Sequence, residues 1–195
     1  MPGGDTPTRD PARGLAGCRR IVVTGTTGSG KTTLTTQLAT RLGVPRIELD
    51  ALYWGPNWTP HPAEAFRASV DVATEGDGWV LDGNYSAVRD IVWSRADTLI
   101  WLDYRLGVNL WRLARRGLVR SLRREVLWNG NRETFRGNFF SRDALIPWAI
   151  KTHGRKRRDI PAALARPEYA HLAVLRFRTP GETRRWLEQA TGGRG

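Results

Sequence analysis

Residues 25–33 read "GTTGSGKTT" and directly follow the apolar run "IVVT". The spacing fits G-x-x-x-x-G-K-[ST], the P-loop pattern, and the matching residues are Gly25, Gly30, Lys31 and Thr32. Backbone N–H groups can approach a phosphate chain closely only where side chains leave room, which glycine permits because it has no Cβ. The stretch therefore demands a strand, a tight anion-binding loop and a helix, in that order.

The residues after the loop predict a helix from about 31 to 42. Leu34, Leu38 and Leu42 recur at four-residue spacing, which indicates a helix. Because this helix begins directly after the loop, its N-terminus faces the anion. We expect ATP to be bound by the loop residues Gly25, Gly28, Ser29, Gly30, Lys31, Thr32 and Thr33. Lys31 can reach the β and γ phosphates, and the Thr32 hydroxyl can ligate Mg²⁺. The alternative is a glycine-rich turn that binds nothing.

Length and composition predict one domain with a short tail. A chain of 195 residues suits a single globular domain, here residues 19–195. Residues 1–18 are rich in proline, glycine and charge, so we expect a disordered N-terminal tail. Cys18 is the only cysteine and would lie in this tail, where a structural or catalytic role is not expected.

The positive charge is concentrated in one segment. The chain has 31 Lys and Arg against 19 Asp and Glu, a net charge of +12. Residues 105–158 hold 15 of the basic residues and only three acids, so the remaining 16 basic and 16 acidic residues cancel. The excess therefore belongs to one part of the molecule and not to its whole surface.

Apolar runs alternate with helical patterns along the chain. The predicted strands are 20–25, 46–49, 79–82, 98–103 and 172–177, and the predicted helices are near 31–42, 62–75, 85–94, 105–127, 142–165 and 180–190. Such alternation favours an α/β fold with a parallel sheet covered on both faces and a ligand site at the carboxyl ends of the strands. No apolar run approaches the length of a membrane span, so we expect a cytoplasmic protein. For the oligomeric state we expect either a monomer or a homodimer.

Three aspartates stand where strands end: Asp50, Asp82 and Asp103. A carboxylate at this position can hold Mg²⁺ through water or accept a proton from a substrate hydroxyl. We assign Asp82 to Mg²⁺ and Asp50 to the acceptor hydroxyl, whereas Asp103 suits a cap on the next helix better. Tyr53, Trp54 and Trp58 can form an apolar wall around an acceptor, although packing around a turn is the commoner role for such residues.

Arginines recur at four-residue spacing on the helix after Asp103. Arg112, Arg116 and Arg120 repel one another along one face, and few nearby acids relieve that repulsion. A bound anion would explain them, because arginines stabilise the charge of a transferring phosphoryl group. We expect Arg112 and Arg116 to be catalytic and residues of about 112–140 to form a basic lid. The alternative is a solvated face.

Taken together, four stretches resemble the bacterial P-loop proteins known as DNA topology modulation proteins, which are similar to adenylate kinases. The stretches are "GTTGSGKTTL", "LDALYWGPNW", "WVLDGNY" and "RADTLIWLDYR", and the resemblance covers residues 20 to about 190. It implies a P-loop NTPase fold, a five-stranded sheet in the order 2-3-1-4-5, a lid, and ATP as phosphoryl donor. It also implies that Asp82 lies near Mg²⁺, that Arg112 and Arg116 belong to the lid, and that Asp50 contacts the acceptor.

The sequence departs from adenylate kinases on the acceptor side. Tyr85 and Ser86 stand where adenylate kinases have Pro-Arg in D-G-F-P-R, and residues 47–66 contain no Lys or Arg. A nucleoside monophosphate brings a phosphate that needs a cationic partner, so a neutral hydroxyl acceptor fits better. The first hypothesis is thus a kinase acting with Mg-ATP on a small molecule. The alternative is a nucleic-acid-associated ATPase or regulator, suggested by "RRGLVRSLRR" and "GRKRR", because such basic runs bind nucleic acid weakly and non-specifically.

Overall fold

The computed structural model describes residues 15, 17–123 and 145–192, without the side chains of 116–123, 145–149 and 191–192. Its strands are β1 (Arg20–Gly25), β2 (Arg46–Glu48), β3 (Trp79–Asp82), β4 (Thr98–Leu102) and β5 (Ala173–Phe177). Its α-helices are α1 (Lys31–Leu42), α2 (Leu49–Tyr53), α3 (Ala63–Ala73), α4 (Arg89–Arg95), α5 (Leu106–Arg123), α7 (Leu145–Leu164) and α8 (Pro180–Gly192). Short 3₁₀ turns are η2 (Pro56–Trp58), η3 (Ser86–Val88) and η5 (Pro167–Tyr169).

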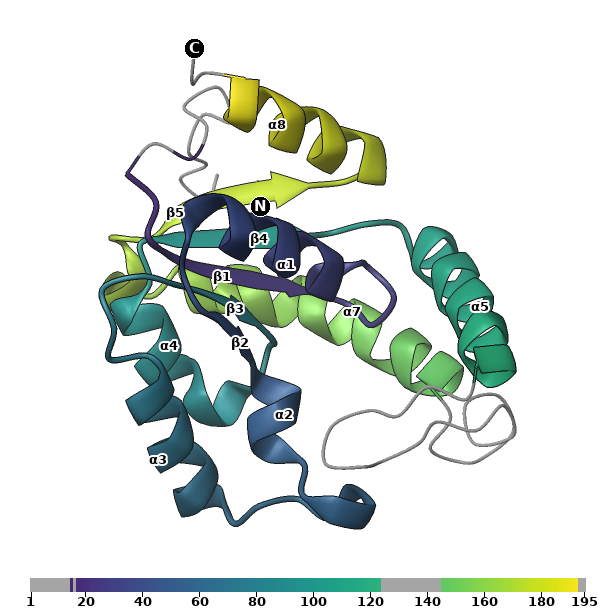
Figure 1. The fold of residues 1–195 in the computed structure, drawn as a ribbon, viewed down its shortest axis with the longest axis horizontal. Helices are drawn as coiled ribbons and strands as arrows, with labels where there is room; N and C mark the ends of the chain where they lie inside the picture. Colours follow the sequence, from purple (N-terminus) through teal and green to yellow (C-terminus); the bar gives the residue numbers. More distant parts are fainter. Residues whose placement is uncertain (1–14, 16, 124–144, 193–195) are drawn as a thin grey trace.

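The five strands form one parallel sheet in the order β2-β3-β1-β4-β5 (Figure 1). The central strand β1 pairs with β3 from Arg20 opposite Trp79 and with β4 from Ile21 opposite Thr98. All strands therefore end at the same edge of the sheet, where the loops that follow them meet. This is the P-loop NTPase fold with the predicted order 2-3-1-4-5.

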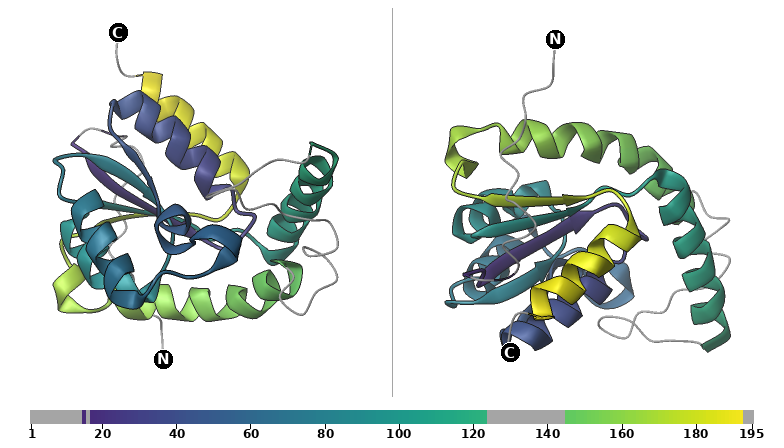
Figure 2. Two further views of the ribbon diagram at one scale, coloured as in Figure 1. Left: turned by 60° about the horizontal axis from the view of Figure 1, so that its bottom comes forward. Right: turned by 90° about the horizontal axis from the view of Figure 1, so that it is seen from above.

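Helices cover both faces of the sheet, as Figure 2 shows. Alternate residues of each strand point to opposite faces, so that Ile21 and Val23 pack with α1 and α8 while Val22 packs with α3, α4 and α7. The first face is closed by the buried side chains of Leu38, Trp186 and Leu187. The second face is closed by those of Phe66, Val70, Val92, Trp93 and Ile160. Both layers are apolar, as a fully covered parallel sheet requires.

The predicted elements agree with the structure to within a few residues, with three differences. The expected helix at 85–94 is a 3₁₀ turn followed by α4, and the short helix α2 was not predicted. Cys18 does not belong to a loose tail: it is 3% exposed, packs in the α1 face of the core and accepts a hydrogen bond from Thr98 Oγ1. The tail prediction for residues 1–14 lies outside the described residues, as does most of the predicted lid.

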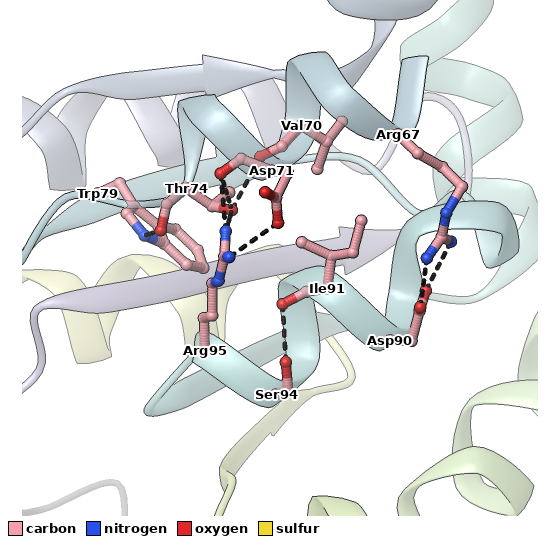
Figure 3. Close-up of polar contacts among 9 residues, drawn as sticks. All are labelled: Arg67, Val70, Asp71, Thr74, Trp79, Asp90, Ile91, Ser94 and Arg95. Atoms are coloured by element: carbon pink, nitrogen blue, oxygen red, sulfur yellow. Dashed lines mark hydrogen bonds and ion pairs between the residues drawn. The ribbon is translucent and has the colours of Figure 1, made fainter. Parts of the chain in front are cut away.

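Arginines join α3 to α4 at two points (Figure 3). Arg67 donates through both terminal nitrogens to the two carboxylate oxygens of Asp90, at 2.9 and 2.6 Å. Arg95 donates to the carbonyl and the carboxylate of Asp71, at 2.7 and 2.8 Å, and also to Thr74 Oγ1. These forked contacts hold two helices of one layer in a fixed relation.

Candidate functional site

The loop after β1 adopts the conformation that its glycines permit. Gly28 and Gly30 have φ angles of 83° and 92°, which residues with a Cβ rarely adopt. A Cβ on Gly28 would lie 2.5 Å from the Asn109 carbonyl oxygen, and a Cβ on Gly30 would lie 3.2 Å from the Arg112 guanidinium. The glycines thus allow both a left-handed backbone and the close approach of α5.

The loop leads into the N-terminus of α1, where backbone donors gather. Leu34 N–H makes the first hydrogen bond of the helix, to the Gly30 carbonyl. The N–H groups of Lys31, Thr32 and Thr33 stand in the first turn, where the helix itself offers no acceptor. Ser29 Oγ is buried and has no hydrogen-bond partner among the described residues. A polyphosphate fits these donors and the positive end of the helix dipole.

Thr32 and Asp82 lie side by side, as a magnesium site of this kind requires. Thr32 Oγ1 donates to Asp82 Oδ2 at 2.6 Å, and Asp82 is 8% exposed. Burial raises the pKa of Asp82, while the nearby Lys31 cation and the Thr32 hydroxyl counteract the rise. Mg²⁺ commonly takes one or two protein oxygens and completes its shell with phosphates and water. These two oxygens fit that requirement.

Asp50 is held by a tyrosine from the next loop. Tyr85 Oη donates to Asp50 Oδ1 at 2.5 Å, and the Trp54 side chain is hydrogen-bonded to Tyr85. Indole is only a donor, so the order of donation is Trp54 to Tyr85 to Asp50. Burial and the Asp50 charge raise the pKa of Tyr85, which keeps its hydroxyl protonated. One carboxylate oxygen is thereby engaged, and Asp50 is fixed at the end of β2.

The predicted aromatic wall is a cluster in which the rings pack on one another. Tyr53 lies 4.8 Å from Trp54, 4.8 Å from Tyr85 and 5.1 Å from Phe66, measured between ring centroids. Trp58 lies 5.9 Å from Trp54. Tyr53, Trp54 and Trp58 remain partly exposed. The cluster is therefore both the packing predicted as the commoner role and an apolar surface adjoining Asp50.

Arg112 of α5 lies against the P-loop. Its Nη1 donates to the Ser29 carbonyl at 3.1 Å, and its guanidinium lies 5.9 Å from the centre of the Tyr104 ring. Tyr104 is itself buried and hydrogen-bonded to Thr183 of α8. The structure thus brings Arg112 to the predicted site. The side chain of Arg116 lies outside the described residues, and its catalytic role stays a prediction.

A groove of about 440 Å³ opens beside the P-loop, on the side of α8. One wall comes from Ser29, Gly30 and the first turns of α1, and the other from the start of α8. The residues that complete it are Leu102, Tyr104, Arg112, Pro180, Gly181, Thr183, Arg184, Leu187 and Glu188. Its volume falls within the usual range for small-molecule sites, and it adjoins the predicted phosphate site. It is suited to the nucleoside part of a nucleotide.

Helix α7 closes the site from the opposite side of the sheet. Three of its side chains contact residues at the ends of β1 and β4: Lys156 and Arg157 are neighbours in the chain, and His153 lies one turn before them. His153 Nδ1 lies 3.2 Å from Thr26 Oγ1, and Lys156 Nζ donates to the Gly25 carbonyl at 3.2 Å. Arg157 Nε donates to Asp103 Oδ1 at 2.5 Å. Burial lowers the pKa of His153 and lowers that of Lys156 to about 7.

Asp103 has a structural role other than the predicted helix cap. Its side chain is 1% exposed and receives Arg157 on one oxygen and Arg176 on the other. Arg176 donates to Asp103 Oδ2 through Nε at 3.0 Å and through Nη2 at 2.5 Å. Its guanidinium carbon also lies 4.3 Å from the centre of the Trp101 ring. The carboxylate therefore joins α7 to β5 at the end of β4, and both its oxygens are occupied.

The described residues contain no group of three or more His, Cys, Asp and Glu side chains placed to hold a metal ion. A bound Mg²⁺ would therefore depend on phosphate and water oxygens in addition to Thr32 and Asp82. Within the same ranges, no helix has both the length and the apolar character needed to cross a membrane.

Sequence reasoning missed three contributors to this site: Tyr85 as the partner of Asp50, Lys156 on α7, and the start of α8 as a wall of the groove. Tyr85 stood out only as a departure from D-G-F-P-R. Lys156 and Gly25 are separated by 131 positions, and no local pattern connects them. Thr179, Pro180 and Gly181 at the start of α8 indicated where a helix begins, but they gave no sign of a binding site.

Comparison with known proteins identifies the fold alone. No protein-family model matches the chain, and no curated protein sequence matches it significantly. Among solved structures, shikimate kinase from Bacteroides thetaiotaomicron aligns with a TM-score of 0.53 and 18% identity, over 89% of this chain and 97% of that one. Shikimate kinase from Acinetobacter baumannii in complex with shikimate gives 0.52 and 14%, over 91% and 94%. The resemblance to DNA topology modulation proteins is left untested by these matches.

Proposed function

We propose that this protein is an ATP-dependent small-molecule kinase that transfers the γ-phosphoryl group of Mg-ATP to a hydroxyl. One observation carries the proposal. The Thr32–Asp82 pair and the Tyr85–Asp50 pair stand at adjacent strand ends, close enough for the Asp50 charge to contribute to the raised pKa of Asp82. These neighbouring contacts support a magnesium site at Thr32 and Asp82 and a proton acceptor at Asp50, both next to the P-loop. Solved kinases of the same fold support this assignment by analogy.

The donor side follows from the loop and the groove. The nucleoside lies in the groove between Arg112 and Pro180, and the phosphates lie against the first turn of α1. Lys31 contacts the terminal phosphates, while Thr32 and Asp82 hold the metal. When bound, Mg-ATP supplies the transferable phosphoryl group, and Mg²⁺ offsets the charge that builds up on it. Arg112 can leave the Ser29 carbonyl and place its guanidinium beside the transferring phosphoryl group, whose negative charge it would stabilise.

The acceptor side rests on Asp50. Tyr85 occupies Oδ1, which leaves Oδ2 as the atom that accepts the proton of an incoming hydroxyl. The acceptor oxygen then forms its bond to phosphorus as the bond to ADP breaks, and the proton goes to Asp50. Because residues 47–66 carry no Lys or Arg, we assign the acceptor to alcohols that lack a phosphate on the side facing Asp50.

The test is ADP release from Mg-ATP at about physiological salt, with single candidate acceptors: hydroxyl metabolites, nucleosides, nucleoside monophosphates and duplex DNA. We expect one non-phosphorylated alcohol to accelerate release strongly. Lys31→Ala should abolish this acceleration while the thermal unfolding curve stays cooperative. Unchanged turnover in that variant would contradict the proposal. Acceleration by duplex DNA alone would instead favour the nucleic-acid-associated ATPase suggested by the basic segment.

A further inference from the structure

Lys156 is a basic residue of the candidate site, and the mechanism above gives it no role. It is partly buried on α7, and its amine reaches the first residue of the P-loop, donating to the Gly25 carbonyl at 3.2 Å. A neutral carbonyl is an acceptor that a neutral amine and an ammonium group can both use. The contact therefore holds the side chain in place without fixing its charge.

The charged groups around Lys156 come from four elements. Lys31 of α1 opposes its positive charge, as does Arg155 of α7 itself, while Asp50 of α2 and Asp82 of β3 favour it. His153 stands one turn earlier on α7 and contacts Thr26. Burial is the largest influence and Lys31 the next, and together they lower the pKa of Lys156 to about 7. Lys31 and Lys156 thus share one site, where the charge of one disfavours the charge of the other.

We propose that Lys156 is a second phosphate-binding lysine of this site, and that its amine takes up one proton from solvent when a nucleoside triphosphate binds. This inference rests on the proposed nucleotide binding at the P-loop. The incoming phosphates screen Lys31 and supply negative charge beside Lys156, and both effects favour the ammonium form. The proton comes from solvent and goes to Nζ, so that nucleotide binding and proton binding become linked.

The linkage has a defined direction with pH. Below pH 7 the lysine already carries its proton in the empty site, so binding takes up little. Above pH 7 the empty site holds a neutral amine, and binding must add the proton. With a pKa of about 7 in the empty site, uptake is about 0.9 proton at pH 8 and about 0.1 at pH 6.

Isothermal titration calorimetry with Mg-ATP measures this uptake directly. The binding enthalpy is recorded at pH 8 in buffers of different ionisation enthalpy, and its slope against that enthalpy gives the protons taken up per nucleotide. We expect the slope of the natural protein to exceed that of Lys156→Met by close to one proton. We also expect Lys156→Met to bind Mg-ATP about tenfold more weakly, the loss that follows from removing one charge-assisted hydrogen bond.

Three more variants separate this role from a merely structural one. Lys156→Arg keeps a permanent charge, so it should retain affinity yet take up no proton. Lys151→Met is the matched control, because Lys151 is exposed on the same helix and should leave the slope unchanged. His153→Gln tests the neighbouring titratable group and should also leave the slope unchanged.

The outcomes distinguish this inference from the proposed function. If Mg-ATP binds with no proton uptake at pH 8, or if uptake persists in Lys156→Met and disappears in His153→Gln, the role of Lys156 is wrong while nucleotide binding stands. If no heat of binding appears with any variant or with the natural protein, the proposed function itself fails. Uptake that depends on Lys156 and vanishes in Lys156→Arg supports the inference.

Discussion

Two carboxylates of the candidate site have different neighbours, and the roles that we propose for them rest on these neighbours. Asp82 lies in a buried position beside a hydroxyl and a cation, where burial disfavours its charge until a metal compensates it. Asp50 instead accepts from a tyrosine that stays protonated, and so remains ready to accept a second proton donor. Similar chemistry in different surroundings is how one active site separates metal binding from proton transfer.

Asp82→Asn should stabilise the empty protein and weaken its response to Mg-ATP. Because burial raises the pKa of Asp82, its ionisation opposes folding. The stabilising effect of the variant is absent below the ordinary carboxylate pKa and grows as pH rises through the raised value. At pH 7 we expect Tm to rise by about 2–4 °C, the shift that about 1 kcal/mol produces in a domain of this size. Thermal unfolding with and without Mg-ATP measures both effects, and a lower Tm in the empty variant would contradict the prediction.

Tyr85→Phe should slow phosphoryl transfer without changing the affinity for ATP. The variant keeps the ring packing and removes the hydroxyl, which is the donor to Asp50 and the acceptor from Trp54. Hydrogen bonds to a charged group contribute about 1.5–3 kcal/mol, so we expect kcat to fall roughly tenfold to a hundredfold. Steady-state kinetics with the best acceptor from the panel are the measurement. Tyr169→Phe, on η5 against Trp93, is the control and should retain full kcat.

Among the elements, the P-loop lies so near α5 that a Cβ on Gly28 would stand 2.5 Å from the Asn109 carbonyl oxygen. Gly28→Ala should therefore lose more than the strain of a left-handed residue. Gly43→Ala is the matched control, because Gly43 has φ of 65° with open space around it. We expect Gly43→Ala to cost about 1–2 kcal/mol in the free energy of unfolding. Gly28→Ala should cost more, and it should also lose Mg-ATP binding, because the new methyl group meets the Asn109 carbonyl. Equal effects of the two substitutions would rule out a role for this contact.

Helix α7 is fixed to the sheet by the buried Asp103 carboxylate. Asp103→Ala leaves Arg157 and Arg176 without their shared partner, but both guanidinium groups remain partly exposed to solvent, so we expect a cost of about 1.5–3 kcal/mol, the range for hydrogen bonds to a charged group. Asp159→Ala removes a partner from an exposed pair at 4.0 Å on the same helix and should cost less than about 1 kcal/mol. Urea unfolding of the two variants compares these costs, and similar midpoints would show that Asp103 is not the anchor.

The elements that could be predicted are those with a local signature. The glycine spacing located the P-loop, and the ends of all five strands fell within a residue of their prediction because apolar runs stop where strands stop. Cys18 was misassigned because it directly follows a segment rich in proline and glycine. Its buried position comes from packing in the core and a hydrogen bond from Thr98, which lies far away in the sequence. Tyr85 and Lys156 reach the site through tertiary packing, and such contacts leave no periodic trace in the sequence.

The two sides of the candidate site differ in the contacts between their helices. On the proposed acceptor side, where Phe66 of α3 packs against Tyr85, two arginine–carboxylate contacts at Arg67 and Arg95 join α3 to α4. On the nucleotide side, Arg112 and the start of α8 face one another across an open groove. The described part of the chain thus combines a braced acceptor side with a nucleotide side that has room to close.

Hydrogen–deuterium exchange should show this division when Mg-ATP binds. We expect slower exchange in the P-loop and the first turns of α1, α5 and α8, because the nucleotide contacts these segments. Exchange in α3 and α4 should change little, since their relation is already fixed without ligand. Protection that spreads equally through α3 and α4 would show that the acceptor side also closes.

The groove between α1 and α8 is built from two segments that lie far apart in the chain. One wall comes from the P-loop and α1, and the other comes from α8, which follows all five strands. The central strand β1 must also wait for β3 and β4 before it has partners. During synthesis, therefore, local folding of the P-loop and α1 cannot complete the groove, which forms only after α8 has been made and the sheet has assembled.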